Sequence, residues 1–206
     1  MKKISTENFE DAVGKTVSAL KRGEIIVYPT ETVYGIGADC TNESAVNRLY
    51  LIKKRDPQKP VLLVAADVDM VKDYVKDISD MSKKIIESFW PGPLTVVFKA
   101  GDSISGNLTA GTGTIGIRVP DNRFCREMSC GLGKPVVSTS ANISGEKFCS
   151  KIEDISEDVL MSVDLIIDAG KTKEGIPSTV ISLTGEKPVI IRQGAVSEEN
   201  LREFMK

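Results

Sequence analysis

Two polar segments of the chain carry side chains that could bind a phosphate or a carboxylate, and each follows a predicted strand. Segment 29–37, Pro-Thr-Glu-Thr-Val-Tyr-Gly-Ile-Gly, offers two threonine hydroxyls and two glycines whose backbone amides a ligand can approach closely. Segment 138–142, Ser-Thr-Ser-Ala-Asn, offers small hydroxyls and one amide as neutral hydrogen-bond donors. Ligands of open α/β sheets lie at the carboxyl ends of strands, so both segments are candidate sites. An ordinary hydrogen-bonded turn is the alternative for each.

Several Arg and Lys side chains lie at positions where an anionic ligand or a buried carboxylate would balance their charge. Arg118 lies within an apolar strand pattern, so its guanidinium must reach a cleft or a buried anion. Arg192 follows the apolar run 189–191, so its guanidinium must also reach a cleft or a buried anion. Lys53, Arg55 and Lys59 combine an arginine fork with lysine point charges, which suits a triphosphate. The same cluster could instead complement a helix dipole and face solvent, and the sequence leaves both interpretations open.

The composition excludes several kinds of catalysis. The chain has 206 residues and no histidine, which removes Ser-His-Asp and Cys-His catalysis and any zinc site that needs imidazole. A net charge of −2 disfavours a protein whose whole surface binds nucleic acid. No apolar run approaches the roughly 20 residues of a membrane-spanning helix. Gly14-Lys15-Thr16 resembles the end of a phosphate loop, but Phe9 stands where its first glycine would be.

The four cysteines form no Cys-x-x-Cys pair, and the N-terminus does not read as a signal peptide. These features predict reduced, buried thiols in a cytoplasmic protein. A disulfide between Cys125 and Cys130 is the alternative.

Short β-branched runs alternate with amphipathic stretches along the chain, which is the pattern of an α/β domain. Helices are predicted at 8–21, 44–55, 67–75, 79–89, 123–132 and 198–205. Strands are predicted at 24–29, 60–65, 94–99, 114–119, 135–137, 164–168, 179–183 and 188–191, with loops at 30–39 and 101–113. So many strands in one chain of this length require a large sheet. We therefore expect a single α/β domain over residues 1–206, with a large, twisted, mixed sheet and flanking helices.

Six motifs follow one another in a recognisable order. They are Pro-Thr-Glu-Thr-Val-Tyr-Gly at 29–35, Lys53-x-Arg55, Trp-Pro-Gly-Pro-Leu-Thr at 90–95, Ser140-x-Asn142, Pro-Ser-Thr-Val at 177–180 and Arg192-x-Gly194. Together they resemble the YrdC-like threonylcarbamoyl-AMP synthase family, in its short single-domain form, over about residues 8–196. The resemblance implies a YrdC/RibB-like fold with a concave, positively lined cavity. It also implies a nucleotidyltransferase that converts L-threonine, bicarbonate or CO2, and ATP into threonylcarbamoyl-AMP and pyrophosphate.

The resemblance also implies roles for individual residues. Lys53 and Arg55 would be the catalytic cations. ATP would bind at Arg55, Lys59, Thr114, Ser140, Asn142 and Arg192, and threonine at Thr32, Val64, Arg118, Ser138 and Ser178, with Arg118 paired to the threonine carboxylate. No protein metal ligand is implied, and Mg²⁺ would enter with ATP and help offset its roughly four negative charges. Many relatives carry a polar side chain near the position of Val64, so here only its backbone could contribute.

The implied product serves a separate threonylcarbamoyl transferase complex, which modifies the adenosine beside the anticodon of tRNAs that read ANN codons. A cytoplasmic protein without membrane contact is expected, and a direct contact with tRNA or double-stranded RNA stays open. A binding module for such RNA is the alternative function, although 5% aromatic residues offer little to stack on bases. A carbamoyl-adenylate enzyme like the related domain of hydrogenase-maturation carbamoyltransferases is the other alternative. A stand-alone chain of this length disfavours it.

Overall fold

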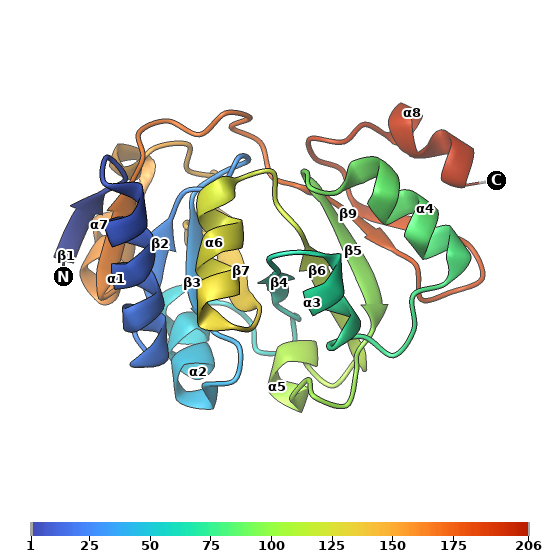
Figure 1. The fold of residues 1–206 in the computed structure, drawn as a ribbon, viewed down its shortest axis with the longest axis horizontal. Coiled ribbons are helices and arrows are strands. Elements are labelled where there is room, and N and C mark those ends of the chain that lie inside the picture. Colours follow the sequence, from blue (N-terminus) through green and yellow to red (C-terminus); the bar gives the residue numbers. More distant parts are fainter. Residues whose placement is uncertain (1, 206) are drawn as a thin grey trace.

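A computed structural model describes residues 2–205 (Figure 1). Its strands form one ten-stranded sheet in the order β1-β8-β2-β3-β7-β4-β6-β5-β9-β10. They are β1 (Lys2–Ser5), β2 (Ile26–Tyr28), β3 (Gly35–Asp39), β4 (Leu62–Val64), β5 (Leu94–Lys99), β6 (Thr114–Arg118), β7 (Val136–Ser140), β8 (Leu165–Asp168), β9 (Thr179–Ser182) and β10 (Val189–Arg192). Four neighbouring pairs are parallel, β1–β8, β8–β2, β4–β6 and β5–β9, and the others are antiparallel. The predicted mixed sheet is confirmed.

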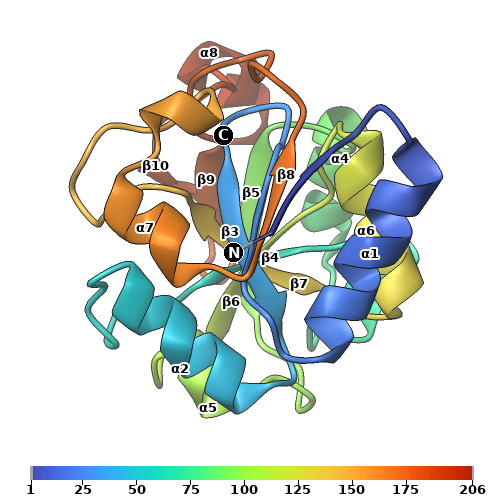
Figure 2. The same cartoon turned by 90° about the vertical axis from the view of Figure 1, so that its left-hand side faces the viewer.

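Helices cover both faces of the sheet. They are α1 (Phe9–Lys21), α2 (Glu43–Ile52), α3 (Val68–Lys72), α4 (Asp80–Phe89), α5 (Gly106–Thr109), α6 (Arg123–Leu132), α7 (Glu157–Ser162) and α8 (Glu198–Leu201), with 3₁₀ turns at Ile152–Asp154 and Arg202–Phe204. Helices α1 and α6 lie side by side against one face, and α2 and α7 lie on the opposite side (Figure 2).

Side-chain alternation along the strands divides the core into two apolar clusters. One face sends Val27, Ile36, Leu63, Val137 and Ile117 into a large cluster with side chains of α2, α4 and α7. The other face sends Tyr28, Val64 and Val136 toward α1 and α6. On that second face α1 and α6 cover β8, β2 and β3, whereas much of β7, β4, β6, β5 and β9 borders an open cavity. The incomplete helical cover is what leaves room for a ligand.

Helix α6 shows how local sequence sets an element boundary. The Asn122 side chain accepts a hydrogen bond from the Cys125 amide, which caps the N-terminus. The C-terminus ends on Gly133 with a φ of 77°, in the left-handed region that glycine adopts without strain. The helix predicted at 123–132 is therefore confirmed to the residue. The strand predicted at 94–99 is confirmed as β5 in the same way.

Several predicted boundaries were wrong. The predicted loop 30–39 contains β3, because Gly35–Asp39 pairs with both β2 and β7 despite its two glycines. The strand predicted at 135–137 continues through Ser140, so Ser138 lies within β7 rather than after it. Helix α5 interrupts the predicted loop 101–113, and the C-terminal helix is split into α8 and a 3₁₀ turn. Strand β1 and helix α7 were not predicted.

All four cysteines are free, so the alternative disulfide between Cys125 and Cys130 is not formed. Cys40, Cys125 and Cys149 are buried as predicted, but Cys130 is exposed. Between residues 2 and 205, none of the helices has the length and apolar character needed to cross a bilayer.

Candidate functional site

A cavity of about 400 Å³ lies on the part of the sheet that α1 and α6 leave uncovered. Ten of the twelve predicted site residues line it: Thr32, Arg55, Lys59, Val64, Thr114, Arg118, Ser138, Ser140, Ser178 and Arg192. They come from distant parts of the sequence: some lie on strands, where residues two apart face the same side, and Thr32, Arg55, Lys59 and Ser178 lie in loops next to strands. In β6, for example, Thr114, Gly116 and Arg118 line the cavity while Ile115 and Ile117 enter the core.

Three of the cavity's cations, Arg55, Lys59 and Arg192, form no ion pair within residues 2–205. Backbone carbonyls hold the two guanidinium groups instead. Arg55 Nη2 donates to the Pro60 carbonyl at 2.7 Å. Arg192 donates to the Ser178 carbonyl from Nη2 at 2.8 Å and from Nε at 3.2 Å. Carbonyls orient these groups without neutralising them, so their positive charge remains available to a ligand.

Arg192 sits where two loops approach closely. A Cβ on Gly194 would lie only 2.5 Å from the carbonyl carbon of Ser178, so this approach requires glycine. Burial lowers the pKa of the Arg192 guanidinium, and the nearby charges of Arg118 and Arg55 lower it further. Like charges gathered in a partly desolvated space favour binding of an anion that offsets them.

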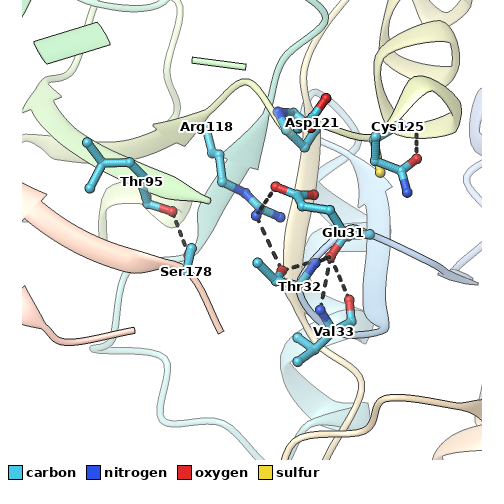
Figure 3. Close-up of polar contacts among 12 residues, drawn as sticks. Glu31, Thr32, Val33, Thr95, Arg118, Asp121, Cys125 and Ser178 are labelled. Carbon is cyan, nitrogen blue, oxygen red and sulfur yellow. Dashed lines mark hydrogen bonds and ion pairs between the residues drawn. The ribbon is translucent and has the colours of Figure 1, made fainter. Parts of the chain in front are cut away.

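Arg118 differs from these cations because a buried carboxylate already faces it (Figure 3). Its Nη1 lies 2.9 Å from Glu31 Oε1 and 3.3 Å from Thr32 Oγ1. Its Nε and Nη2 have no hydrogen-bond partner among residues 2–205. Glu31 Oε2 is buried and also lacks a partner there. Arg118 is therefore fixed at one nitrogen and retains donors for a ligand.

Neighbouring polar side chains hold the cavity hydroxyls in place. Ser178 Oγ lies 2.9 Å from Thr95 Oγ1 and accepts a hydrogen bond from Arg192 Nη2 at 3.2 Å. Ser138 Oγ accepts a hydrogen bond of 2.6 Å from the Tyr28 hydroxyl. Each hydroxyl therefore has a fixed position before any ligand arrives.

Lys53 and Asn142 are the two predicted site residues that do not line the cavity. Lys53 Nζ is buried and donates to the backbone carbonyls of Ser140 and Asn142. The Asn142 amide nitrogen donates to two carbonyls of its own loop, at 2.9 and 2.8 Å. Burial, with the charge of Arg55, lowers the pKa of Lys53 to about 8. Both side chains are engaged in holding the segment that carries Ser140.

Val64 contributes an apolar wall to the cavity. Its side chain is 2% exposed and packs in the cluster with α1 and α6. Its carbonyl accepts a hydrogen bond from Ser129 Oγ at 3.3 Å, so the backbone oxygen already has a partner.

The sequence did not predict several residues that shape the site. Glu31 and Tyr28 contact predicted residues from behind, Thr95 contacts Ser178 from within the lining, and the lining also includes Leu62, Val97, Val180 and Ile191. Thr30 and Thr139, which belong to the two polar segments singled out in the sequence, line the cavity as well. The sequence did hold an indirect signal for Glu31. An arginine in an apolar strand needs a cleft or a buried anion, and Glu31 is such an anion.

Within residues 2–205, no group of three His, Cys, Asp or Glu side chains is placed to hold a metal ion. The residues that line the cavity include no carboxylate, whereas Mg²⁺ prefers oxygen ligands with carboxylates among them. The described residues thus do not fit a resident metal centre.

Comparisons with known proteins agree with this fold. A family model labelled Sua5/YciO/YrdC, with the description "Telomere recombination", matches residues 18–194. A protein of Methanocaldococcus jannaschii is 37% identical over 196 residues, 93% of this chain and 92% of that protein. The threonylcarbamoyl-AMP synthase of Bacillus subtilis is 33% identical over 190 residues, 92% of this chain. The structure of Pyrococcus abyssi Sua5 complexed with L-threonine superposes with a TM-score of 0.93 at 29% identity over 99% of this chain.

The share of each relative that is matched differs. The chain spans nearly all of the M. jannaschii protein, but 55% of the B. subtilis synthase and 60% of P. abyssi Sua5. The family model covers most of the chain, and two relatives exceed 30% identity over more than nine-tenths of it. This chain belongs to the Sua5/YciO/YrdC family.

Proposed function

We propose that this protein is a threonylcarbamoyl-AMP synthase that supplies threonylcarbamoyladenosine modification of tRNA. The observation that carries the proposal is the cavity itself, which combines Arg118 and small hydroxyls with three cations, Arg55, Lys59 and Arg192, that form no ion pair in the described part of the chain. A nucleoside triphosphate and an amino-acid carboxylate are the two anions that such a lining suits. Relatives with this enzyme name support the proposal over most of the chain.

The amino-acid half of the cavity is assigned to Thr32, Arg118, Ser138 and Ser178, with Val64 as a wall. The free Nε and Nη2 of Arg118 form a fork for the threonine carboxylate, while Glu31 holds Nη1. In this assignment Arg118 both pairs with a buried anion, Glu31, and reaches a cleft, which are the two explanations that its place in an apolar strand allowed. The P. abyssi Sua5 structure, complexed with L-threonine, is the relative that supports this half.

The ATP half is assigned to Arg55, Lys59 and Arg192 as phosphate contacts, with the hydroxyls of Thr114 and Ser140. Lys53 and Asn142 are positioning residues in this proposal, because their polar atoms are engaged in the backbone of segment 140–146. Mg²⁺ would arrive as part of the MgATP substrate, since the cavity lining offers it no carboxylate.

The chemistry needs no nucleophile from the protein. The threonine amine adds to the carbon of CO2, which is formed by dehydration of bicarbonate, and loses a proton to give a carbamate. A carbamate oxygen attacks the α-phosphorus of ATP, and the bond to the β-phosphate oxygen breaks to release pyrophosphate. Positioning and charge stabilisation dominate such phosphoryl chemistry. A chain without histidine can perform it because the substrates supply the nucleophiles and the cavity supplies cations.

Pyrophosphate release tests the proposal directly. The purified protein should release pyrophosphate from ATP only when both threonine and bicarbonate are present, and mass spectrometry should detect threonylcarbamoyl-AMP. Arg192→Ala should reduce the release, whereas Lys83→Ala on the surface of α4 serves as a matched control for loss of a cation. Threonine-independent ATP hydrolysis, or silence with all three substrates, would refute the proposal.

The proposal also covers the use of the product, the cellular location of the protein and its contact with RNA. A separate threonylcarbamoyl transferase complex would consume the product, because a carbamoyl-adenylate is a mixed anhydride that water hydrolyses. The protein would act in the cytoplasm as one catalytic unit over residues 1–206. A contact with tRNA or double-stranded RNA would reveal itself as an affinity that falls steeply with added salt.

A further inference from the structure

Tyr28 lies directly behind the cavity and has no role in the site assignments above. It is among the largest side chains that are fully buried, and it does not line the cavity. Its hydroxyl donates to Ser138 Oγ at 2.6 Å, and Ser138 does line the cavity. The phenol is thus one hydrogen bond away from any ligand that Ser138 contacts.

Two glycines allow Tyr28 to reach Ser138. Tyr28 is on β2 and Ser138 on β7, with β3 between them. Gly35 lies opposite Tyr28, and Gly37 lies opposite Ser138. A Cβ on Gly37 would lie 2.9 Å from Tyr28 Cε1, and one on Gly35 would lie 3.2 Å from it. Because both side chains are absent, the ring crosses β3 and places its hydroxyl at β7.

The direction of this hydrogen bond fixes what Ser138 can do. Burial raises the pKa of the Tyr28 hydroxyl, so it stays protonated and donates at neutral pH. A serine hydroxyl has one proton of its own and two lone pairs. Ser138 Oγ accepts the phenol proton, and no atom of residues 2–205 accepts the proton of Ser138. The acceptor that is missing can come from the cavity.

The sheet register places Ser138 and Arg118 on one wall of the cavity. Leu62 of β4 lies opposite Ser138 on one side and Gly116 on the other. Arg118 is two residues beyond Gly116, so its side chain points to the same face. A ligand oxygen that accepts from Ser138 therefore lies within a region that also holds the unpartnered Nε and Nη2 of Arg118. Two such donors on one wall suit a carboxylate.

We propose that Tyr28 is a positioning residue that makes Ser138 a hydrogen-bond donor toward the carboxylate of the amino-acid substrate. The inference rests on the proposed function, because it takes the ligand of this wall to be an amino acid. Without the phenol, the Ser138 hydroxyl is free to rotate and to accept as well as donate, so part of its preference for an anionic oxygen is lost.

The test is Tyr28→Phe, which keeps the ring and removes only the hydroxyl. We expect the KM for L-threonine to rise about fivefold, as for one neutral hydrogen bond, while kcat and the KM for ATP stay within about twofold. Tyr74→Phe is the matched control, because Tyr74 is partly buried outside the cavity. Thermal unfolding of each variant reports any general loss of stability.

A second variant separates positioning from packing. Ser138→Ala should raise the KM for L-threonine by itself, and adding Tyr28→Phe to it should cause no further rise, because the phenol acts only through Ser138. (R)-1-Aminopropan-2-ol, in which a hydrogen replaces the carboxylate of L-threonine, should bind wild type and Tyr28→Phe with equal affinity in calorimetry.

Three outcomes would overturn the inference. An unchanged KM for L-threonine in Tyr28→Phe would show that the phenol does not act on the substrate. A rise in the KM for ATP instead would place a phosphate at Ser138, and an additive loss in the double variant would indicate packing alone. Threonine-dependent activity of the wild type distinguishes these results from failure of the proposed function, since an inactive wild type that binds no threonine overturns both.

Discussion

Removal of the Glu31 carboxylate tests whether a buried ion pair holds Arg118. The Glu31 and Arg118 side chains are 5% and 8% exposed, and their nearest polar atoms are 2.9 Å apart. Glu31→Ala leaves the guanidinium without its counter-ion, a change that typically costs about 3–5 kcal/mol. Glu31 Oε2 has no hydrogen-bond partner among the described residues, 2–205, and its removal recovers about 1–3 kcal/mol. The expected net loss in the free energy of unfolding is therefore about 2 kcal/mol.

A double-mutant cycle isolates the pair. Arg118→Met removes the other charge, and the double variant Glu31→Ala/Arg118→Met should be less destabilised than the sum of the two single variants, because neither charge is left unpaired. Urea unfolding at neutral pH can be followed by the fluorescence of Trp90, the single tryptophan. The exposed Asp80–Lys83 pair on α4 is the control and should show little coupling.

Additive losses in this cycle would refute the ion pair as the support of Arg118. So would a Glu31→Ala variant as stable as the wild type. If the pair positions Arg118 for the substrate, Glu31→Ala should also raise the KM for L-threonine more than the KM for ATP, since Arg118 is assigned to the amino-acid half.

The remaining three predictions concern the cations Arg192 and Lys53 and the close packing around Gly37. Arg192→Ala should raise the KM for ATP about tenfold or more, as for a charge-assisted hydrogen bond, measured by pyrophosphate release. Between pH about 8 and about 10.4 the folded protein holds fewer protons on Lys53 than the unfolded chain, so this side chain makes stability rise with pH. Lys53→Met should remove that rise in urea unfolding measured across this range. Gly37→Ala should destabilise by about 1–3 kcal/mol in the same assay, because the added Cβ meets Tyr28 and Val136 at 2.9 and 3.0 Å.

Elements whose ends depend on local chemistry could be predicted from the sequence. Helix α6 begins at a capping asparagine and ends at a glycine in the left-handed conformation, and both signals are visible within ten residues or so. The facing of Arg118 and Gly116 could also be predicted, because alternation in a strand depends on neighbouring residues alone. The resemblance to a known family, rather than alternation, supplied the full set of predicted site residues, ten of which line one cavity.

Features that depend on distant partners could not be predicted in the same way. Segment 35–39 contains two glycines, which disfavour a strand locally, yet pairing with β2 and β7 makes it one. The glycines are accommodated because the Tyr28 ring fills the space over them. Glu31 is separated from Arg118 by 87 residues, so no local pattern announces their pairing.

The cavity cations fall into two kinds according to what holds them, and the difference explains how one space can receive two substrates. Arg118 is held by a carboxylate, so most of its charge is balanced and its remaining donors act mainly through geometry. Arg55 and Arg192 are held by carbonyls, which orient a guanidinium and leave its charge in place. In the proposed reaction the balanced arginine meets a zwitterionic amino acid and the unbalanced ones meet a polyanion. The charge of each arginine thus matches the substrate assigned to it.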